Sequence, residues 1–127
     1  MASKKITADR LGQEIQNILE KYGDDIEADL DFITKKIAQK GATALRNESK
    51  ASFNGTGKYA SGWSATTVKH PHYTSAVIHN KKVPGLPHLL EHGHALRSGG
   101  RVQGRIHIEP VETNLIQEYE REVIRSI

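Results

Sequence analysis

Apolar side chains in the first part of the chain recur at helical spacing. One set follows the order i, i+4, i+7, i+8 and i+11, which is one face of an amphipathic helix: Leu11, Ile15, Ile18, Leu19 and Tyr22. Thr7 suits the N-cap of such a helix, and Gly23 suits its end. The pattern therefore predicts a first helix over about residues 7–22.

A second apolar face follows with the same period. Its members are Ile26, Leu30, Ile33, Ile37 and Leu45. They predict a second helix over about residues 25–48, with Asp24 or Asp25 as its N-cap. Gly41 and Ala42 form a small-residue patch on this helix, where another segment of the protein can approach closely.

The middle of the chain changes from helical spacing to alternation. Residues 51–62 are rich in glycine, serine and asparagine and have no period, which predicts a mobile loop. Residues 63–69 and 73–79 are β-branched and alternating, and Pro71 lies in the short connection between them. These two segments are therefore predicted to pair as an antiparallel hairpin.

The last third combines short elements with one longer helix. Residues 86–93 are predicted to form a short helix that Gly93 ends. Residues 94–104 follow as a polar, basic loop, and the alternation over residues 105–109 predicts a third strand. Pro110 suits the first turn of a C-terminal helix.

These elements predict an α+β fold with two N-terminal helices, a small antiparallel sheet of about three to four strands, a short helix and a C-terminal helix. A length of 127 residues fits a single domain over residues 1–127. Within it we distinguish a helical part over about residues 7–48, the mobile loop 51–62, and a sheet-plus-helix part over residues 63–127.

Composition limits both the core and the chemistry. Only 36% of the residues are hydrophobic, so the core of one copy should be modest and self-association could complete it. The chain has no cysteine, which excludes disulfides, thiolate metal sites and cysteine nucleophiles. The longest apolar stretches are too short to cross a membrane, and we expect a protein made in the cytoplasm.

Charge is distributed unevenly along the chain. The net charge is +3, but residues 81–105 carry five basic side chains against one acid, Glu91, and the final 22 residues are acidic. The basic residues of this segment are Lys81, Lys82, Arg97, Arg101 and Arg105. Such asymmetry suits either nucleic acid or neighbouring copies of the chain. We favour neighbouring copies, because dedicated DNA-binding proteins carry a denser basic stripe.

Histidines near residue 90 raise the question of a metal site. His88 and His92 are spaced i, i+4, with Glu91 between them and His94 just beyond. Leu89, however, occupies the place directly after the first histidine, where zinc proteases carry their catalytic glutamate. Local hydrogen bonding by these histidines is favoured over metal binding. No serine lies in a strand–turn–helix elbow either, so we predict no enzymatic activity and no cofactor.

The basic segment over residues 97–105 is the main candidate for binding. Arginines beside free glycine amides can follow a phosphate backbone, can order against an acidic neighbour, or can stay solvated. Trp63 is expected in the core or a subunit contact. Phe53 and Tyr59 could anchor a partner or fold back onto the core.

Three motifs in a fixed order resemble those of the small minor-capsid, neck or tail-completion proteins of long-tailed phages. They are residues 59–63 (YASGW), residues 87–93 (PHLLEHG) and residues 106–111 (IHIEPV). The resemblance covers about residues 8–125. Many such proteins have an aromatic-Leu-Pro string before the last helix, where this chain has Ile108-Glu109-Pro110, and this leaves the subgroup open.

The resemblance implies a structural protein of the virion neck, assembled in the host cytoplasm and active through protein contacts. It implies a ring of copies, with six-fold symmetry expected, between the capsid connector or stopper and the tail terminator or tail tube proteins. Contact with packaged DNA through the basic segment is the alternative.

The resemblance and the charge pattern together give two sets of residues. The candidate contact residues are Arg97, Arg101, Arg105, Lys81, Lys82, Phe53 and Tyr59. The motif residues expected to shape the fold are Glu91, Gly93, Trp63 and Pro110. We expect Glu91 to accept hydrogen bonds from the backbone of the following loop, or to pair with one of the three arginines.

Overall fold

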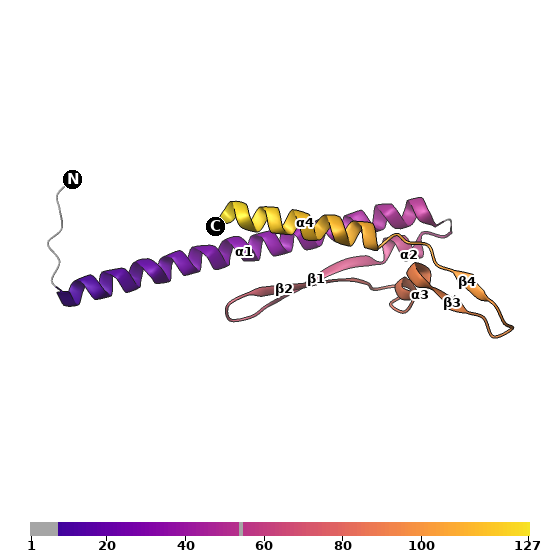
Figure 1. Ribbon diagram of the computed structural model, residues 1–127, viewed down its shortest axis with the longest axis horizontal. Helices are drawn as coiled ribbons and strands as arrows, with labels where there is room; N and C mark the ends of the chain where they lie inside the picture. Colours follow the sequence, from indigo (N-terminus) through magenta and orange to yellow (C-terminus); the bar gives the residue numbers. More distant parts are fainter. Residues whose placement is uncertain (1–7, 54) are drawn as a thin grey trace.

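The computed structural model describes residues 8–53 and 55–127 and shows an elongated α+β protein (Figure 1). Its elements, in chain order, are α1 (Ala8–Ser52), α2 (Lys58–Ser61), β1 (Trp63–Lys69), β2 (Thr74–Asn80), α3 (Leu86–His92), β3 (Gly93–Ala95), β4 (Arg101–Gln103) and α4 (Glu109–Ser126). The α+β class is confirmed.

The first described element, α1, is one continuous helix, so the prediction of two helices divided at Gly23 is wrong. α1 runs through Gly23 without a break over 45 residues. A single glycine inside a helix costs only about 1 kcal/mol, and the residues after it keep the helical period. Thr7, the expected cap, lies outside the described residues.

The sheet is also smaller than expected. β1 and β2 pair antiparallel, with Trp63 opposite Asn80 and Lys69 opposite Thr74, which confirms the predicted hairpin. β3 and β4 form a second two-stranded sheet within the segment expected to be a loop. Residues 105–108 are not a strand in the structure, so the predicted third strand is wrong.

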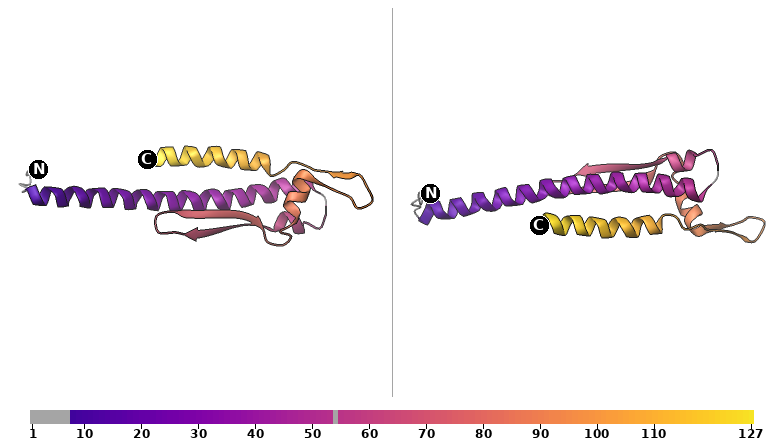
Figure 2. Two further views of the ribbon diagram at one scale, coloured as in Figure 1. Left: turned by 60° about the horizontal axis from the view of Figure 1, so that its bottom comes forward. Right: turned by 90° about the horizontal axis from the view of Figure 1, so that it is seen from above.

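α1 is the support on which the other long elements pack. Figure 2 shows α4 running back along α1, with the β1–β2 hairpin on a different side of the same helix. Gly41 lies where both approach: a Cβ atom at this position would be 2.5 Å from the side chains of Ile78 and Leu115. The predicted small-residue patch thus receives side chains from β2 and α4.

Apolar burial is concentrated in the second half of α1 and beside it. The buried apolar residues within the described ranges are Ile33, Ile37, Ala38, Ala42, Leu45, Ala60 and Trp63. The expectation of a modest core is therefore confirmed. Ion pairs from Lys36 to Glu122, at 3.3 Å, and from Lys40 to Glu118 add contacts between α1 and α4.

The tip of the first hairpin is tied to α1. The hydroxyl of Thr74 donates a hydrogen bond to Asp31, and this bond and Lys35 hold the pKa of Asp31 below its usual value. His72 lies 3.3 Å from Glu27, which is one turn further towards the N-terminus.

Among the described helices, none is both long and apolar enough to span a bilayer.

Candidate functional site

A buried carboxylate joins α3 to the start of α4. Glu91, only 6% exposed, accepts hydrogen bonds from the backbone N–H groups of His107, Ile108 and Glu109 at 2.8, 2.9 and 3.0 Å. Burial alone would raise the pKa of Glu91, but these three donors and the nearby His107 hold it below its usual value. Glu91 therefore caps α4 from another element, where Pro110 occupies the first turn.

His107 is the centre of this cluster and is fully buried. Its Nδ1 atom lies 2.8 Å from the carbonyl oxygen of Arg105 and 2.9 Å from Glu91. Two acceptors at this nitrogen require that it carry the proton, so Nε2 accepts a hydrogen bond from the hydroxyl of Tyr59 at 2.6 Å. Burial, with a contribution from the charge of Glu91, raises the pKa of Tyr59 to about 12.

Phe53 and Tyr59 fold back onto this histidine. Their ring centroids lie 4.8 and 5.6 Å from that of His107, and the two rings meet edge to face at 5.7 Å. Arg105 lies above the ring of Phe53, 5.8 Å from its centroid, and donates to the carbonyl of Ser52. Of the two alternatives for these aromatic residues, the structure shows packing within the chain.

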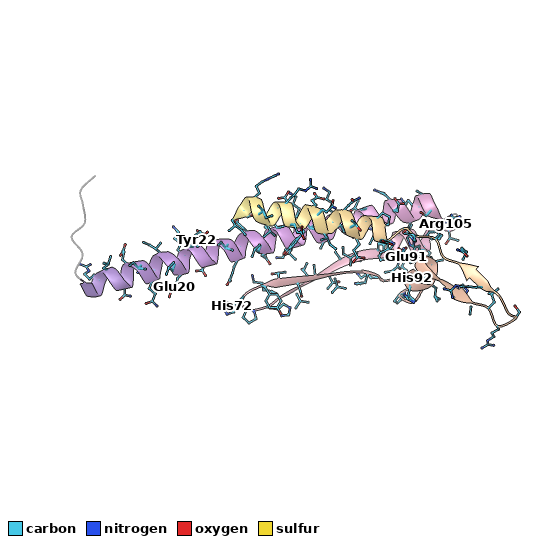
Figure 3. The ribbon with its side chains drawn as sticks, viewed as in Figure 1. Glu20, Tyr22, His72, Glu91, His92 and Arg105 are labelled. Atoms are coloured by element: carbon cyan, nitrogen blue, oxygen red, sulfur yellow. The ribbon has the colours of Figure 1, made fainter. Side chains whose placement is uncertain are left out.

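Polar contacts extend the cluster to β1 and β2. The indole N–H of Trp63 donates to the hydroxyl of Ser49 at 2.9 Å, and Arg46 donates to the carbonyl of Trp63 at 3.0 Å. The Asn80 amide donates to the carbonyl of Tyr59 at 2.8 Å. Trp63 is 4% exposed and lies in the core, which is one of the two positions expected for it. Figure 3 shows Glu91, His92 and Arg105 near the C-terminal end of α1, where these elements meet.

The basic candidates are all exposed, but they do not share one environment. Arg97 lies in the turn between β3 and β4, and Arg101 donates to the carbonyl of His92 at 2.8 Å. Lys82 donates to the hydroxyl of Ser61 at 2.8 Å, and Lys81 is exposed beside it. None of the described ion pairs joins Glu91 to an arginine.

The histidines of the short helix contact one another. The rings of His88 and His92 lie 4.9 Å apart, whereas His94 follows on β3, and its Nδ1 atom is buried without a hydrogen-bond partner. Within residues 8–53 and 55–127, no group of three histidine or acidic side chains is placed to hold a metal ion.

Two apolar surfaces lie open beyond the polar cluster. We call residues 10–25 of α1 the arm. The first surface is the apolar stripe on this arm, whose side chains are 49–63% exposed: Leu11, Ile15, Ile18, Leu19 and Tyr22. The second is a groove of about 1000 Å³ between β2 and α4. Its floor on α1 includes the buried residues Ile37 and Ala38. Its walls include Ile78, Leu115 and Ile116, and Ile116 is 52% exposed.

Sequence reasoning missed the most buried polar groups. Within the segment RIHIE, Ile106 is 60% exposed and His107 is fully buried, the reverse of what their polarity indicates. Ser49 and Asn80 were also not singled out, although both are buried. Their roles depend on partners distant in sequence, which single-sequence periodicity does not reveal.

Comparisons with protein-family models, curated proteins and solved structures give no match for this chain.

Proposed function

We propose that the chain is a non-enzymatic structural protein that assembles with copies of itself into a ring and joins the head of a long-tailed phage to its tail. The three ordered motifs support the phage assignment. The surface of the protein supports the assembly, because exposed apolar stripes and grooves of this size are typical of protein interfaces.

The observation that carries this proposal is the large accessible surface of one copy. It measures 9561 Å², whereas a compact monomer of 14.1 kDa exposes about 6,700 Å². The excess of about 2,800 Å² is more than the roughly 800 Å² that each partner contributes to a standard interface. Discounting about 160 Å² for each of the eight residues outside the described ranges leaves an excess of about 1,500 Å².

Three measurements test this function. Light scattering on the full chain should give the mass of a closed ring at micromolar concentration, and electron microscopy should show a central opening. A phage deleted for the gene should accumulate separate heads and tails. A chain that stays monomeric, together with normal joining in the deleted phage, would overturn the proposal.

DNA contact by the β3–β4 hairpin is the second candidate function. The specific observation in its favour concerns Glu91, the one acid among residues 81–105. It is buried and accepts hydrogen bonds from backbone N–H groups. The five basic side chains of that segment, in contrast, are all exposed. Replacing Arg97 and Arg101 by alanine should weaken duplex DNA binding. It should also reduce the slope of log affinity against log salt concentration by about one for each lost phosphate contact. Wild-type binding that does not change with salt would remove this candidate.

A further inference from the structure

The arm is an amphipathic helix whose apolar stripe is exposed. Every side chain from residue 10 to residue 25 is exposed except Glu14, which is partly covered. Figures 1 and 2 show this part of α1 projecting beyond the end of α4 and beyond the turn of the first hairpin. Tyr22 and Glu20 are labelled on it in Figure 3, away from the packed elements. The apolar stripe of the arm therefore lies in water in an isolated copy.

The groove is about as long as the apolar stripe of the arm. The apolar stripe spans residues 11–22, and the groove floor on α1 extends from Thr34 to Leu45, so each covers about 16 Å at 1.5 Å per residue. Amphipathic helices bind in such grooves through apolar anchors spaced i, i+3, i+4 and i+7. The stripe contains this spacing in Ile15, Ile18, Leu19 and Tyr22.

The arm of one copy cannot occupy the groove of that same copy. Both belong to α1, which is one uninterrupted helix, so the arm leads away from the groove floor. Each copy therefore offers one helix and one groove that only different molecules can bring together. Such a contact between unlike surfaces generates a ring when its rotation closes.

We propose that the arm of one copy docks its apolar stripe into the groove between β2 and α4 of a second copy, an inference that rests on the proposed ring function. Each copy then uses two different surfaces, one towards each neighbour. The excess accessible surface, about 1,500 Å² after the discount described above, is close to what two contacts of about 800 Å² each would bury.

The test uses two full-length variants that each lose one surface. Ile15→Glu with Ile18→Glu places charge on the arm, where both side chains are at least half exposed. Ile116→Glu places charge on the groove wall at a side chain that is 52% exposed. Both changes lie on helix surfaces, so circular dichroism should show unchanged helix content. Each variant alone should be monomeric in light scattering.

Mixing the two variants gives the decisive measurement. The arm variant keeps an intact groove and the groove variant keeps an intact arm, so the mixture should form a 1:1 complex that cannot grow further. The matched controls add the same number of charges at exposed positions: Gln13→Glu with Asn17→Glu on the polar face of the arm, and Gln117→Glu on α4. Each should assemble like the wild type, and loss of assembly in a control would count against the specific contact.

The outcomes separate this inference from the proposed function. A groove variant that still assembles, or a mixture that stays monomeric, would overturn the arm-and-groove contact. The wild-type ring would then form through another surface, such as pairing of two arms, and the proposed function would stand. A wild-type chain that is monomeric at every concentration would overturn both.

Discussion

The hydroxyl of Tyr59 and the Nε2 atom of His107 lie 2.6 Å apart, although 48 residues separate them in the chain. The hydrogen bond connects α2 with the segment that leads into α4. Since His107 also contacts Glu91, one buried histidine links three parts of the chain. The cluster holds these elements together, and the fully buried imidazole presents no surface to a substrate.

Removing the Tyr59 hydroxyl should therefore destabilise the protein. In Tyr59→Phe, the buried Nε2 atom of His107 loses its donor, which should lower the free energy of unfolding by about 1–3 kcal/mol. Urea denaturation measures this difference. Tyr73→Phe is the matched control, because that side chain is 61% exposed, and its effect should stay within about 0.5 kcal/mol. Equal effects of the two changes would show that the buried hydrogen bond contributes nothing specific.

Glu91 should make stability depend on pH in the acid range. Its pKa is lowered in the folded protein, so its contribution is complete above the unfolded value, about 4.5, and is lost as the pH falls through the folded value. Glu91→Gln should cost about 1–3 kcal/mol at pH 7, because a backbone donor loses its acceptor.

This pH dependence is measured as a difference between two proteins, because Asp31 and Glu118 also have lowered pKa values. The gap in unfolding free energy between wild type and Glu91→Gln should narrow from pH 7 to pH 2.5. A gap that stays constant over this range would show that the charge of the carboxylate is not what caps α4.

Gly93 should not tolerate a side chain. Its φ angle is +78°, and a Cβ atom there would also collide with the carbonyl oxygen of Val102 on the paired strand. Gly99 has a φ of +96° but nothing within 4 Å of the same position, so Gly99→Ala reports backbone strain alone. We expect Gly99→Ala to cost about 1 kcal/mol and Gly93→Ala clearly more, as measured by thermal unfolding. A smaller cost at Gly93 would contradict the β3–β4 pairing.

Gly23 tests the continuity of α1. A Cβ atom at this position meets nothing within 4 Å. Gly23→Ala should therefore stabilise the helix locally by about 1 kcal/mol and raise the helix content of the arm. Gly23→Pro should break the arm away from the rest of α1 while the core stays folded. Amide hydrogen exchange over residues 10–25 measures both effects. A loss of protection in Gly23→Ala would indicate that the two-helix prediction was correct.

The elements with strong local signals were predictable. The first hairpin, the short helix that ends before Gly93 and the C-terminal helix near Pro110 were each predicted close to their observed bounds. The continuity of α1 through Gly23 was not predictable, because a glycine with an N-cap residue after it looks the same whether the helix ends or continues. Only the absence of a turn-forming sequence beyond Asp25 favoured continuity.

The candidate site was less predictable, for a different physical reason. Glu91 was expected to accept backbone hydrogen bonds from the loop that follows it, but its donors belong to residues 107–109 at the start of α4. The alternation over residues 105–109 suggested a strand with its isoleucines on the buried face, but Ile106 is 60% exposed and His107 is buried instead. Both features depend on which distant segments meet, which local patterns do not specify.

Because α1 is unbroken at Gly23, the direction in which the apolar stripe of the arm points is fixed relative to the rest of the protein. One residue inserted between the arm and Glu27 would move the stripe outward by about 1.5 Å and turn it by about 100°. An insertion of seven or eleven residues would restore its direction to within about 20° while lengthening the arm by about 10 or 16 Å. Arm length, and with it the separation that neighbouring copies can span, can therefore change only in discrete steps.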